Sequence, residues 1–439
     1  MSSSTSLFQV KQVQTIQDHK PGAGISKVSF SPNGRILASS SADSFIHLYT
    51  PSFASSTVTE TNVFGKQSTL SGHAKGVSDF VWSSDSRYVC SCSDNQLIIM
   101  WDVEKSKPIQ LFPNPTPTDM HTINSHRNQH HSNPAQSALF LHDIFIENQI
   151  TSSLHSATNT DPSNTNSNTA NNTPSSIKQE CKDHITSIHT TNTAASSSTH
   201  SNTSNPNNHM NNDNSNDSNN NINTTHTHYI LCLALNQQGN IMASGSFDET
   251  VILWDVRSAK HIQILYAHSD PVCCLSFCND GTMLLSGGYD GLIRGWDMSS
   301  RRCMKTLGFD PTAISFAKWS PNGQYIISGT LDSTIRIWDF QTAKTLKTFK
   351  GHKNEKYCLF SDFAKIGNLD CIVCGSEDGF VYFWDIKTKR IVHKFKAHDD
   401  VVMATNFRYN HNDSNVSNAS LFVSGGLQND NAVRLWQIV

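Results

Sequence analysis

An all-β fold, a seven-bladed β-propeller built from WD repeats, is predicted by three residue types that recur along the 439-residue chain. An aromatic residue ends each unit, and Trp254, Trp296 and Trp338 follow one another at intervals of 42 residues. An aspartate or asparagine stands six residues before each aromatic residue, and a histidine stands 28 residues before three of them. A period of about 40–45 residues is that of one four-stranded blade. The seven aromatic residues are Tyr49, Trp101, Trp254, Trp296, Trp338, Trp384 and Trp436.

The aspartates and histidines suggest why the repeat is needed. A histidine can bridge a turn aspartate and a strand hydroxyl, whose hydrogen bonding continues to the tryptophan indole, so that buried polar groups satisfy one another. Such a set resembles a catalytic triad, but its sevenfold recurrence indicates scaffolding, and the sequence has no phosphate-binding loop. We therefore expect no enzyme. The turn residues are Asp43, Asn95, Asp248, Asp290, Asp332, Asp378 and Asp430, and the upstream residues are His19, His73, His226, His268, Asp310, His352 and His398.

The last blade needs a strand from elsewhere, because the sequence continues for only three residues after Trp436. The segment Phe8–Ile16 has the same pattern as the outer strand expected before His352. An N-terminal strand that closes the seventh blade would remove the open sheet edges that invite aggregation. Runs such as Gln324–Gly329 and Thr334–Asp339 show the alternation expected of half-buried strands.

A long segment interrupts the repeat between Trp101 and Trp254, which lie 153 residues apart. Residues 113–224 are rich in Asn, Ser, Thr and His and too polar to offset their ordering entropy, so we expect a long disordered insert. Within it, Ala138–Ile150 is apolar and could form a helix, dock on a partner or collapse transiently. The predicted organisation is a disordered tail over 1–7, the closing strand and two blades over 8–112, the insert over 113–224, and five blades over 225–439.

Composition narrows the function further. A formal net charge of −3 gives no case for nucleic-acid binding, and no apolar run is long enough to cross a membrane. The start of the chain lacks the apolar core of a signal peptide, so we expect a reducing compartment. Cys371 and Cys374 form a C-x-x-C pair without a second pair, so the eleven cysteines are interpreted as structural. Low-complexity composition explains His121, His126, His130 and His131 more simply than weak metal binding does, and we expect no metal and no cofactor.

The repeat register also predicts the lining of the central channel. A mixture of aromatic rings and carboxylates there suits an arginine guanidinium, which stacks on aromatic faces and donates up to five hydrogen bonds. Tyr357 and Phe360 of the sixth blade add further ring surface to this mouth. The alternative is that Phe247, Tyr289 and Phe360 are exposed aromatic residues of a general interaction surface. Residues expected at the starts of the innermost strands are Ser26, Ser78, Leu231, Cys273, Ser315, Cys358 and Met403, and those expected at the mouth are Ala42, Asp94, Phe247, Tyr289, Leu331, Glu377 and Asn429.

Five runs carry a resemblance to a known family: SPNGRILASSSAD (31–43), GVSDFVWSSDS (76–86), SGSFDETVILWDV (244–256), AHSDPV (267–272) and GHKNEKYCLF (351–360). They resemble the WD-repeat subunit of the COMPASS/MLL-type complexes, which methylate histone H3 on lysine 4. The resemblance extends through all seven blades and leaves out only the tail and the insert. It implies a non-catalytic scaffold in the nucleus, with a SET-domain methyltransferase subunit, other COMPASS-type core subunits and the histone H3 tail as partners.

The resemblance further implies an arginine site at the top of the central channel. Two positions depart from the family, which sandwiches the guanidinium between two phenylalanines. Phe360 is present, but Leu231 replaces its partner, which removes a π-face worth roughly 0.5–2 kcal/mol. Cys273 replaces a serine, a better hydrogen-bonding group. The implied arginine-binding residues are Ala42, Ser78, Asp94, Leu231, Phe247, Pro271, Cys273, Tyr289, Ser315, Tyr357, Cys358 and Phe360.

A second surface is implied on the opposite face, between the fifth and sixth blades, for an acidic-hydrophobic peptide of another core subunit. Lys365 and Lys387 depart from the family pattern in the direction that favours an acidic peptide, although solvated surface lysines remain the alternative. The implied residues are Asn322, Tyr325, Ile337, Lys347, Phe363, Lys365 and Lys387.

A different class of function is indicated by Trp254–Arg257, which reads W-D-x-R. Substrate receptors of cullin-type ubiquitin ligases use this motif to dock their adaptor. The repeat already requires the Trp-Asp pair at this place, so the motif is a weak indication.

Overall fold

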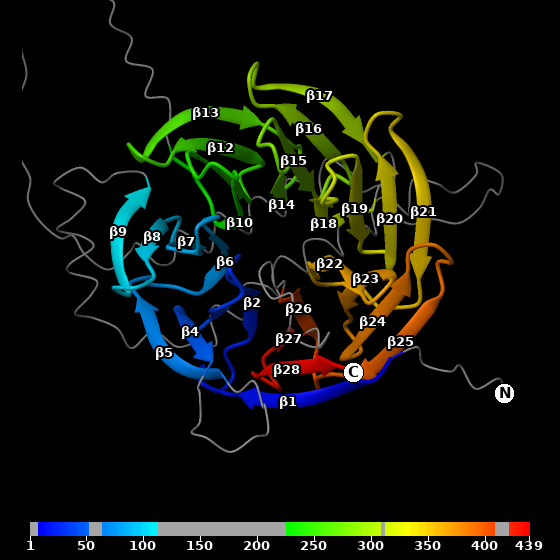
Figure 1. Ribbon diagram of the computed structural model, residues 1–439. Helices are drawn as coiled ribbons and strands as arrows, with labels where there is room; N and C mark the ends of the chain where they lie inside the picture. The colour runs from blue at the N-terminus through cyan, green and yellow to red at the C-terminus, as the bar shows by residue number, and fades with distance from the viewer. Residues whose placement is uncertain (1–7, 52–63, 113–224, 309–311, 409–420) are drawn as a thin grey trace, which may run out of the picture. The chain divides into compact units, whose positions relative to one another are not determined.

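The computed structural model describes residues 8–51, 64–112, 225–308, 312–408 and 421–439, all of which belong to one compact unit. Seven four-stranded antiparallel sheets stand around a central axis as the blades of a propeller (Figure 1), which confirms the predicted fold. The described residues contain no helix, and so none that could span a membrane. The tail 1–7, the insert 113–224 with its apolar island and histidines, and Asp310 lie outside the described residues.

Each blade runs from an innermost strand at the channel to an outermost strand at the rim. Blade 1 contains β2 (Ile25–Phe30), β3 (Leu37–Ser41), β4 (Phe45–Pro51) and β5 (Phe64–Ser71). Blade 2 contains β6 (Val77–Trp82), β7 (Tyr88–Ser93), β8 (Ile98–Asp102) and β9 (Lys107–Phe112). Blade 3 contains β10 (Ile230–Leu235), β11 (Ile241–Ser246), β12 (Thr250–Asp255) and β13 (Lys260–Tyr266). Blades 4 and 5 contain β14 (Val272–Phe277), β15 (Met283–Gly288), β16 (Ile293–Asp297) and β17 (Arg302–Leu307); and β18 (Ile314–Trp319), β19 (Tyr325–Thr330), β20 (Thr334–Asp339) and β21 (Lys344–Lys350). Blade 6 contains β22 (Ser361–Ile366), β23 (Leu369–Gly375), β24 (Phe380–Asp385) and β25 (Ile391–Lys396), and blade 7 contains β26 (Val402–Phe407), β27 (Leu421–Gly426), β28 (Val433–Ile438) and β1 (Val10–Ile16).

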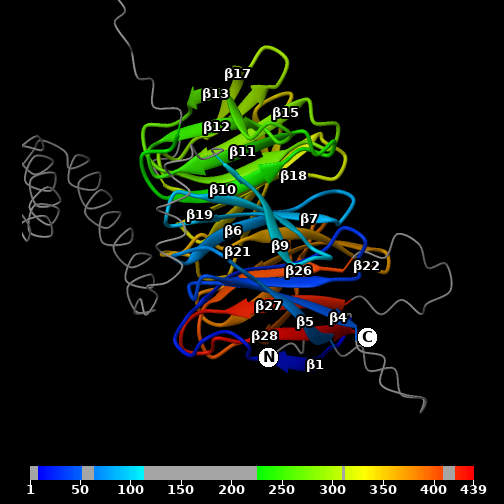
Figure 2. The ribbon, with the colours of Figure 1, turned by 90° about the vertical axis from the view of Figure 1, so that its left-hand side faces the viewer.

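The N-terminal strand closes the ring, as predicted. Strand β1 pairs antiparallel with β28, from Val10 opposite Ile438 to Ile16 opposite Val433. Figures 1 and 2 both show β1 lying beside β28. Phe8 precedes the strand and packs its ring edge-on against Phe383 of blade 6, 5.4 Å between centroids. Strand β1 is therefore the fourth strand of blade 7 and joins the N-terminal part of the chain to the last blade.

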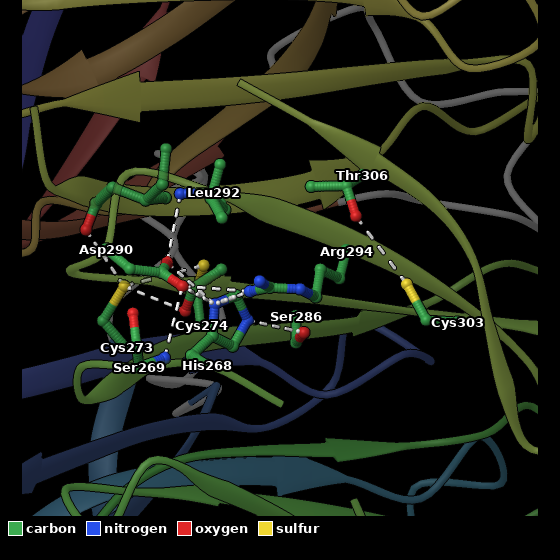
Figure 3. Close-up of polar contacts among 12 residues, drawn as sticks. His268, Ser269, Cys273, Cys274, Ser286, Asp290, Leu292, Arg294, Cys303 and Thr306 are labelled. Atoms are coloured by element: carbon green, nitrogen blue, oxygen red, sulfur yellow. Dashed lines mark hydrogen bonds and ion pairs between the residues drawn. The ribbon is translucent and has the colours of Figure 1, made fainter. Parts of the chain in front are cut away.

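A hydrogen-bonded tie of histidine, serine, aspartate and tryptophan holds blade 4 together. The ring nitrogens of His268 bond Asp290 at 2.8 Å and the Ser286 hydroxyl at 2.8 Å (Figure 3). The Trp296 indole donates to the same hydroxyl at 2.9 Å. Burial opposes ionisation of Asp290, but its hydrogen bonds with His268 and Arg294 hold its pKa at about 2. The tie thus satisfies every polar group that it buries.

The tie is complete in blades 3 and 7 as well and varied in the others. In blade 1 it keeps His19, Ser39 and Asp43, with Tyr49 in place of tryptophan. The complete sets are His226, Ser244, Asp248 and Trp254, and His398, Ser424, Asp430 and Trp436.

The prediction that His352 takes part in such a tie is wrong for blade 6. Cys374 occupies the strand position at which blade 4 has Ser286, so no hydroxyl is available. The Trp384 indole donates instead to the Lys350 carbonyl at 3.1 Å. Neither ring nitrogen of the buried His352 has a hydrogen-bond partner among the described residues.

A β-bulge marks the same position of the innermost strand in every blade except the sixth. In β14, for example, Val272 and Cys274 pair with neighbouring residues of β15, and Cys273 between them is left unpaired. A bulge re-aims one side chain and is common next to binding sites. The six bulge residues are Ser26, Ser78, Leu231, Cys273, Ser315 and Met403.

Candidate functional site in the central channel

The channel contains two chambers that share Phe360. A wide chamber of about 570 Å³ is lined by the later parts of the innermost strands, for example Phe30, Trp82 and Phe277. A narrow chamber of about 110 Å³ is lined by the first residues of those strands and by the loops before them. Because the innermost strands all run the same way along the channel, the two chambers open towards opposite faces of the propeller.

The narrow chamber brings together nine of the twelve residues predicted to bind arginine. These residues come from blades 1 to 4 and from the segment that leads into blade 6, and the bulges place Ser78, Leu231 and Cys273 among them. The nine residues are Ala42, Ser78, Asp94, Leu231, Cys273, Tyr289, Tyr357, Cys358 and Phe360.

Three predicted residues lie outside this lining. Ser315 is fully buried, and its hydroxyl accepts hydrogen bonds from Leu359 N at 2.9 Å and Asn354 Nδ2 at 3.0 Å, so it anchors the segment before β22 from behind the wall. Phe247 stacks on His228 with 4.5 Å between ring centroids. The Pro271 carbonyl accepts a hydrogen bond from Tyr289 N at 3.0 Å and thereby positions that tyrosine.

Blade 7 contributes a residue that counting back from the tryptophan misses. Leu427 N bonds Val401 O at 3.0 Å, as Tyr289 N bonds Pro271 O in blade 4, and Leu427 lines the narrow chamber. The expected residue, Asn429, is exposed. The turn after β27 is two residues longer than its counterpart in blade 4, which shifts the count.

Asp94 supplies the carboxylate of the narrow chamber. Its Oδ1 accepts a hydrogen bond from the Ser78 hydroxyl at 2.9 Å. Burial raises its pKa to about 6. The other expected carboxylate, Glu377, turns instead towards the segment before β22, where it accepts hydrogen bonds from the backbone N–H groups of Glu355, Lys356 and Tyr357. Among the described residues that line the chamber, a cation therefore meets one acidic group, Asp94, which becomes charged as the pH rises through about 6.

The wall formed by Phe360 has a lysine on its other side. Lys27 lines the wide chamber, with Nζ 5.5 Å from the centre of the Phe360 ring and 5.6 Å from that of Phe80. The ammonium pairs with Asp79 Oδ1 at 2.6 Å. The ammonium of Lys27 thus makes a cation–π contact with Phe360, the ring that also lines the narrow chamber.

The residues predicted for the second surface differ in exposure. Asn322 and Tyr325 are exposed at the start of β19, and Lys365 and Lys387 are exposed on blade 6. Lys347 Nζ donates to Ile386 O at 2.7 Å, which links blades 5 and 6.

Two of the residues predicted for the second surface belong to the interior. Ile337 is 6% exposed, and Phe363 packs against the same hydrophobic cluster. Ile337 therefore stabilises the junction of the two blades from within.

The W-D-x-R motif is largely explained by the fold. Trp254 is buried and Asp255 Oδ2 accepts hydrogen bonds from Ser258 in the turn after β12, so both serve the blade. Arg257 in the same turn has an exposed side chain.

Three buried residues of blade 1, His19, Asp43 and His47, lie close enough to share a metal ion. The sequence reasoning missed this cluster, because His47 lies outside the repeat signature. His47 occupies the strand position of Arg294 and Arg434, which pair with the turn aspartates of blades 4 and 7. Burial lowers the pKa of His47 to about 4, and its Nδ1 bonds Thr69 at 2.9 Å. We assign the cluster to the tie of blade 1.

Two family profiles match the sequence. The profile described as the IFT122 first beta-propeller matches residues 212–439, and the WD domain, G-beta repeat, matches residues 10–50 and 64–102. These matches cover stretches from both sides of the insert, in agreement with the seven observed blades.

Curated relatives match shorter stretches. Protein HIRA of Dictyostelium discoideum is 33% identical over 82 residues, 18% of this chain and 7% of that protein. A chromatin assembly factor 1 subunit of Gallus gallus is 32% identical over 101 residues, 20% of this chain and 18% of that protein. The protein HIRA homolog of Drosophila melanogaster is 35% identical over 103 residues, 22% of this chain and 9% of that protein. The chain thus spans less than a fifth of the length of these relatives.

Proposed function

Since the chain belongs to the family of the IFT122 first beta-propeller, with WD repeats as its blades, we propose that it is a non-catalytic scaffold for other proteins. The residues of the ties that look most like catalytic groups are buried in hydrogen-bonded sets within the blades. The side chains that line the narrow chamber include aromatic rings, aliphatic groups, thiols, hydroxyls, the Asp94 carboxylate and Lys356. Such surfaces recognise side chains of a partner.

The ligand that this chamber fits best is an arginine side chain of a partner protein. The observation that carries this proposal is the meeting of Asp94, Phe360 and Tyr289 in a cavity of about 110 Å³. A guanidinium can stack on the rings while it donates hydrogen bonds to the carboxylate and to backbone carbonyls. A lysine would bring a more strongly hydrated point charge and lose the planar contact.

The proposed setting is a nuclear complex that methylates histone H3 on lysine 4. The family resemblance supports it, and the names of the curated relatives, HIRA and chromatin assembly factor 1, point to chromatin more generally. In this proposal the narrow chamber holds an arginine of the SET-domain subunit or of the histone H3 tail. Exposed residues of blades 5 and 6, among them Tyr325 and Lys387, contact a second core subunit.

Two measurements test the proposal. Purification of the tagged protein from cells should recover a SET-domain methyltransferase, and its absence would refute the proposed complex. Calorimetry with an arginine-containing peptide and with the same peptide carrying neutral citrulline tests the chamber. We expect binding of the arginine peptide alone, weakening as the pH falls through about 6 because Asp94 becomes neutral. Equal affinity for the two peptides would exclude guanidinium recognition.

A further inference from the structure

Two thiols from different blades meet in the wall of the narrow chamber. Cys273 is the bulge residue of β14 in blade 4, Cys358 belongs to the segment before β22 in blade 6, and both line the chamber. Cys358 packs against the cluster of side chains that contains Cys273, and the Cys273 thiol is the largest cause of the lowered pKa of Cys358. The Cys273 sulfur is 3.0 Å from Ile314 O, 3.3 Å from Gly287 O and 3.9 Å from the Cys274 sulfur, so its position is fixed from three sides.

A third group converges on Cys358. The Tyr289 hydroxyl lies 3.3 Å from its sulfur, and Tyr289 lines the same chamber. The hydrogen bond with the Cys273 thiol, helped by that of Tyr289, outweighs burial and lowers the pKa of Cys358. Burial alone has the opposite effect at Cys90, where it raises the pKa of the thiol to about 12. The thiolate is the reactive form of cysteine, so Cys358 is set apart by both its surroundings and its access to the chamber.

We propose that Cys273 and Cys358 form an oxidisable dithiol, which a hydroperoxide converts into a disulfide that closes the narrow chamber to an arginine side chain. The effect on arginine rests on the proposed function, whereas the disulfide itself rests on the contact between the two thiols.

The chemistry balances with one hydroperoxide per disulfide. The Cys358 thiolate attacks the terminal peroxide oxygen, the O–O bond breaks, and the departing oxygen takes up the proton that Cys358 had lost. The Cys273 thiol then attacks the sulfur of the resulting sulfenic acid, the S–O bond breaks, and water leaves with the Cys273 proton. The two sulfurs lose two electrons, and the peroxide is reduced to an alcohol, or to water when hydrogen peroxide is used.

The disulfide would change the chamber because of its geometry. Its sulfurs are about 2.05 Å apart, much closer than two thiols that are not bonded to each other. Closing that gap draws the segment that carries Tyr357, Cys358 and Phe360 towards blade 4. It also removes the Cys358 thiol that shares a hydrogen bond with the Tyr289 hydroxyl.

The experiment uses the full chain, reduced or treated with stoichiometric hydrogen peroxide. Peptide mass spectrometry without reductant should find Cys273 linked to Cys358. Calorimetry with the arginine-containing peptide should show binding at least about tenfold weaker after oxidation, with recovery in dithiothreitol. In Cys273→Ser and in Cys358→Ser, peroxide should no longer change the measured affinity. The control Cys303→Ser removes an exposed thiol outside the chamber and should keep both the link and the loss of affinity.

Different failures have different meanings. Oxidation of Cys303 while Cys273 and Cys358 stay unlinked would overturn the dithiol. A complete Cys273–Cys358 link with unchanged peptide affinity would overturn closure of the chamber. If the reduced protein does not bind the arginine peptide, the proposed function fails, and mass spectrometry still decides whether the dithiol forms.

Discussion

Blades 4 and 6 share one strand plan and hold their strands together in different ways. In blade 4, Ser286 receives both the His268 ring and the Trp296 indole, and the strands are tied from turn to core. In blade 6, Cys374 replaces that serine, and the buried His352 ring has no hydrogen-bond partner in the part of the chain that the structure describes.

Blade 6 is secured from its leading segment instead. Glu377 caps three successive backbone N–H groups, and the Ser376 hydroxyl accepts from Lys353 N at 2.9 Å. Ser315 reaches the same segment from blade 5, through Leu359 N and Asn354. Blade 6 can therefore depart from the repeat signature, because hydrogen bonds to its leading segment hold it instead. The same segment supplies Tyr357, Cys358 and Phe360 to the chamber.

The largest effect should come from removing the hydroxyl of blade 4. Ser286→Ala leaves the His268 and Trp296 ring nitrogens unpaired in the core and should lower the free energy of unfolding by about 3 kcal/mol. The matched change in blade 6, Cys374→Ala, removes a sulfur that ties neither residue and should cost about 1 kcal/mol. Urea denaturation measures both, and equal losses would contradict the contrast between the blades.

His352 should make the free energy of unfolding depend on pH. Burial lowers its pKa to about 4, so the unfolded chain takes up the proton first as the pH falls below about 6.5. The stability that the neutral ring contributes is complete above that pH and is lost between about 6.5 and 4. His352→Leu should flatten the curve of unfolding free energy against pH by up to about 3 kcal/mol over this range. Parallel curves for the two proteins would show that blade 6 does not hold an uncharged, unpaired histidine.

The next effect tests whether the segment before β22 carries the binding. Phe360→Ala removes the ring shared by the two chambers and should weaken an arginine-containing peptide by about 2 kcal/mol, or roughly thirtyfold. Tyr325→Ala, an exposed aromatic residue of blade 5, is the control and should leave this affinity unchanged. Calorimetry separates the two, and an undiminished affinity in Phe360→Ala would remove the chamber from the mechanism.

The smallest expected effect is a gain in the free energy of unfolding. Cys374→Ser restores the hydroxyl that the other tied blades have, so His352 and Trp384 can bond it, which should stabilise the fold by roughly 0.5–1.5 kcal/mol. The gain should disappear when His352→Leu is added, because the new hydroxyl then lacks its histidine. Denaturation of the single and double variants measures this coupling, and a gain that survives in the double variant would show another origin.

Much of the fold could be predicted from the sequence because the repeated residues are those that hold each blade together. Closure by the N-terminal strand was predictable from the missing outer strand of the last blade, and Leu231 and Cys273 fell at the channel because the register counts to a recurring bulge. Ser315 also sits at a bulge, yet it is buried, since the segment before β22 covers it.

Other features depend on contacts that no register encodes. Leu427 took the place of Asn429 because one turn is two residues longer. His352 lacks a hydrogen-bond partner among the described residues because Cys374, on strand β23, replaces the serine of the other ties. Cys374 is not part of the repeat signature, so the sequence did not indicate this. The cation behind Phe360 arises from Lys27, which lies far away in sequence and reaches the ring only in the folded channel.

Pairing the first strand with the last has a consequence for how the chain folds. Ile16 and Val433 are 417 residues apart, whereas the hairpin pair Gly425 and Val433 is eight apart. Because the entropy of loop closure grows only with the logarithm of length, the long loop costs about 3.5 kcal/mol more than the hairpin. Most of that difference is already incurred with far shorter spacings, so lengthening the chain between blades hardly changes the stability of the clasp. The ring can therefore accept 112 additional residues between β9 and β10 at a thermodynamic cost that is small beside that of a single lost tie.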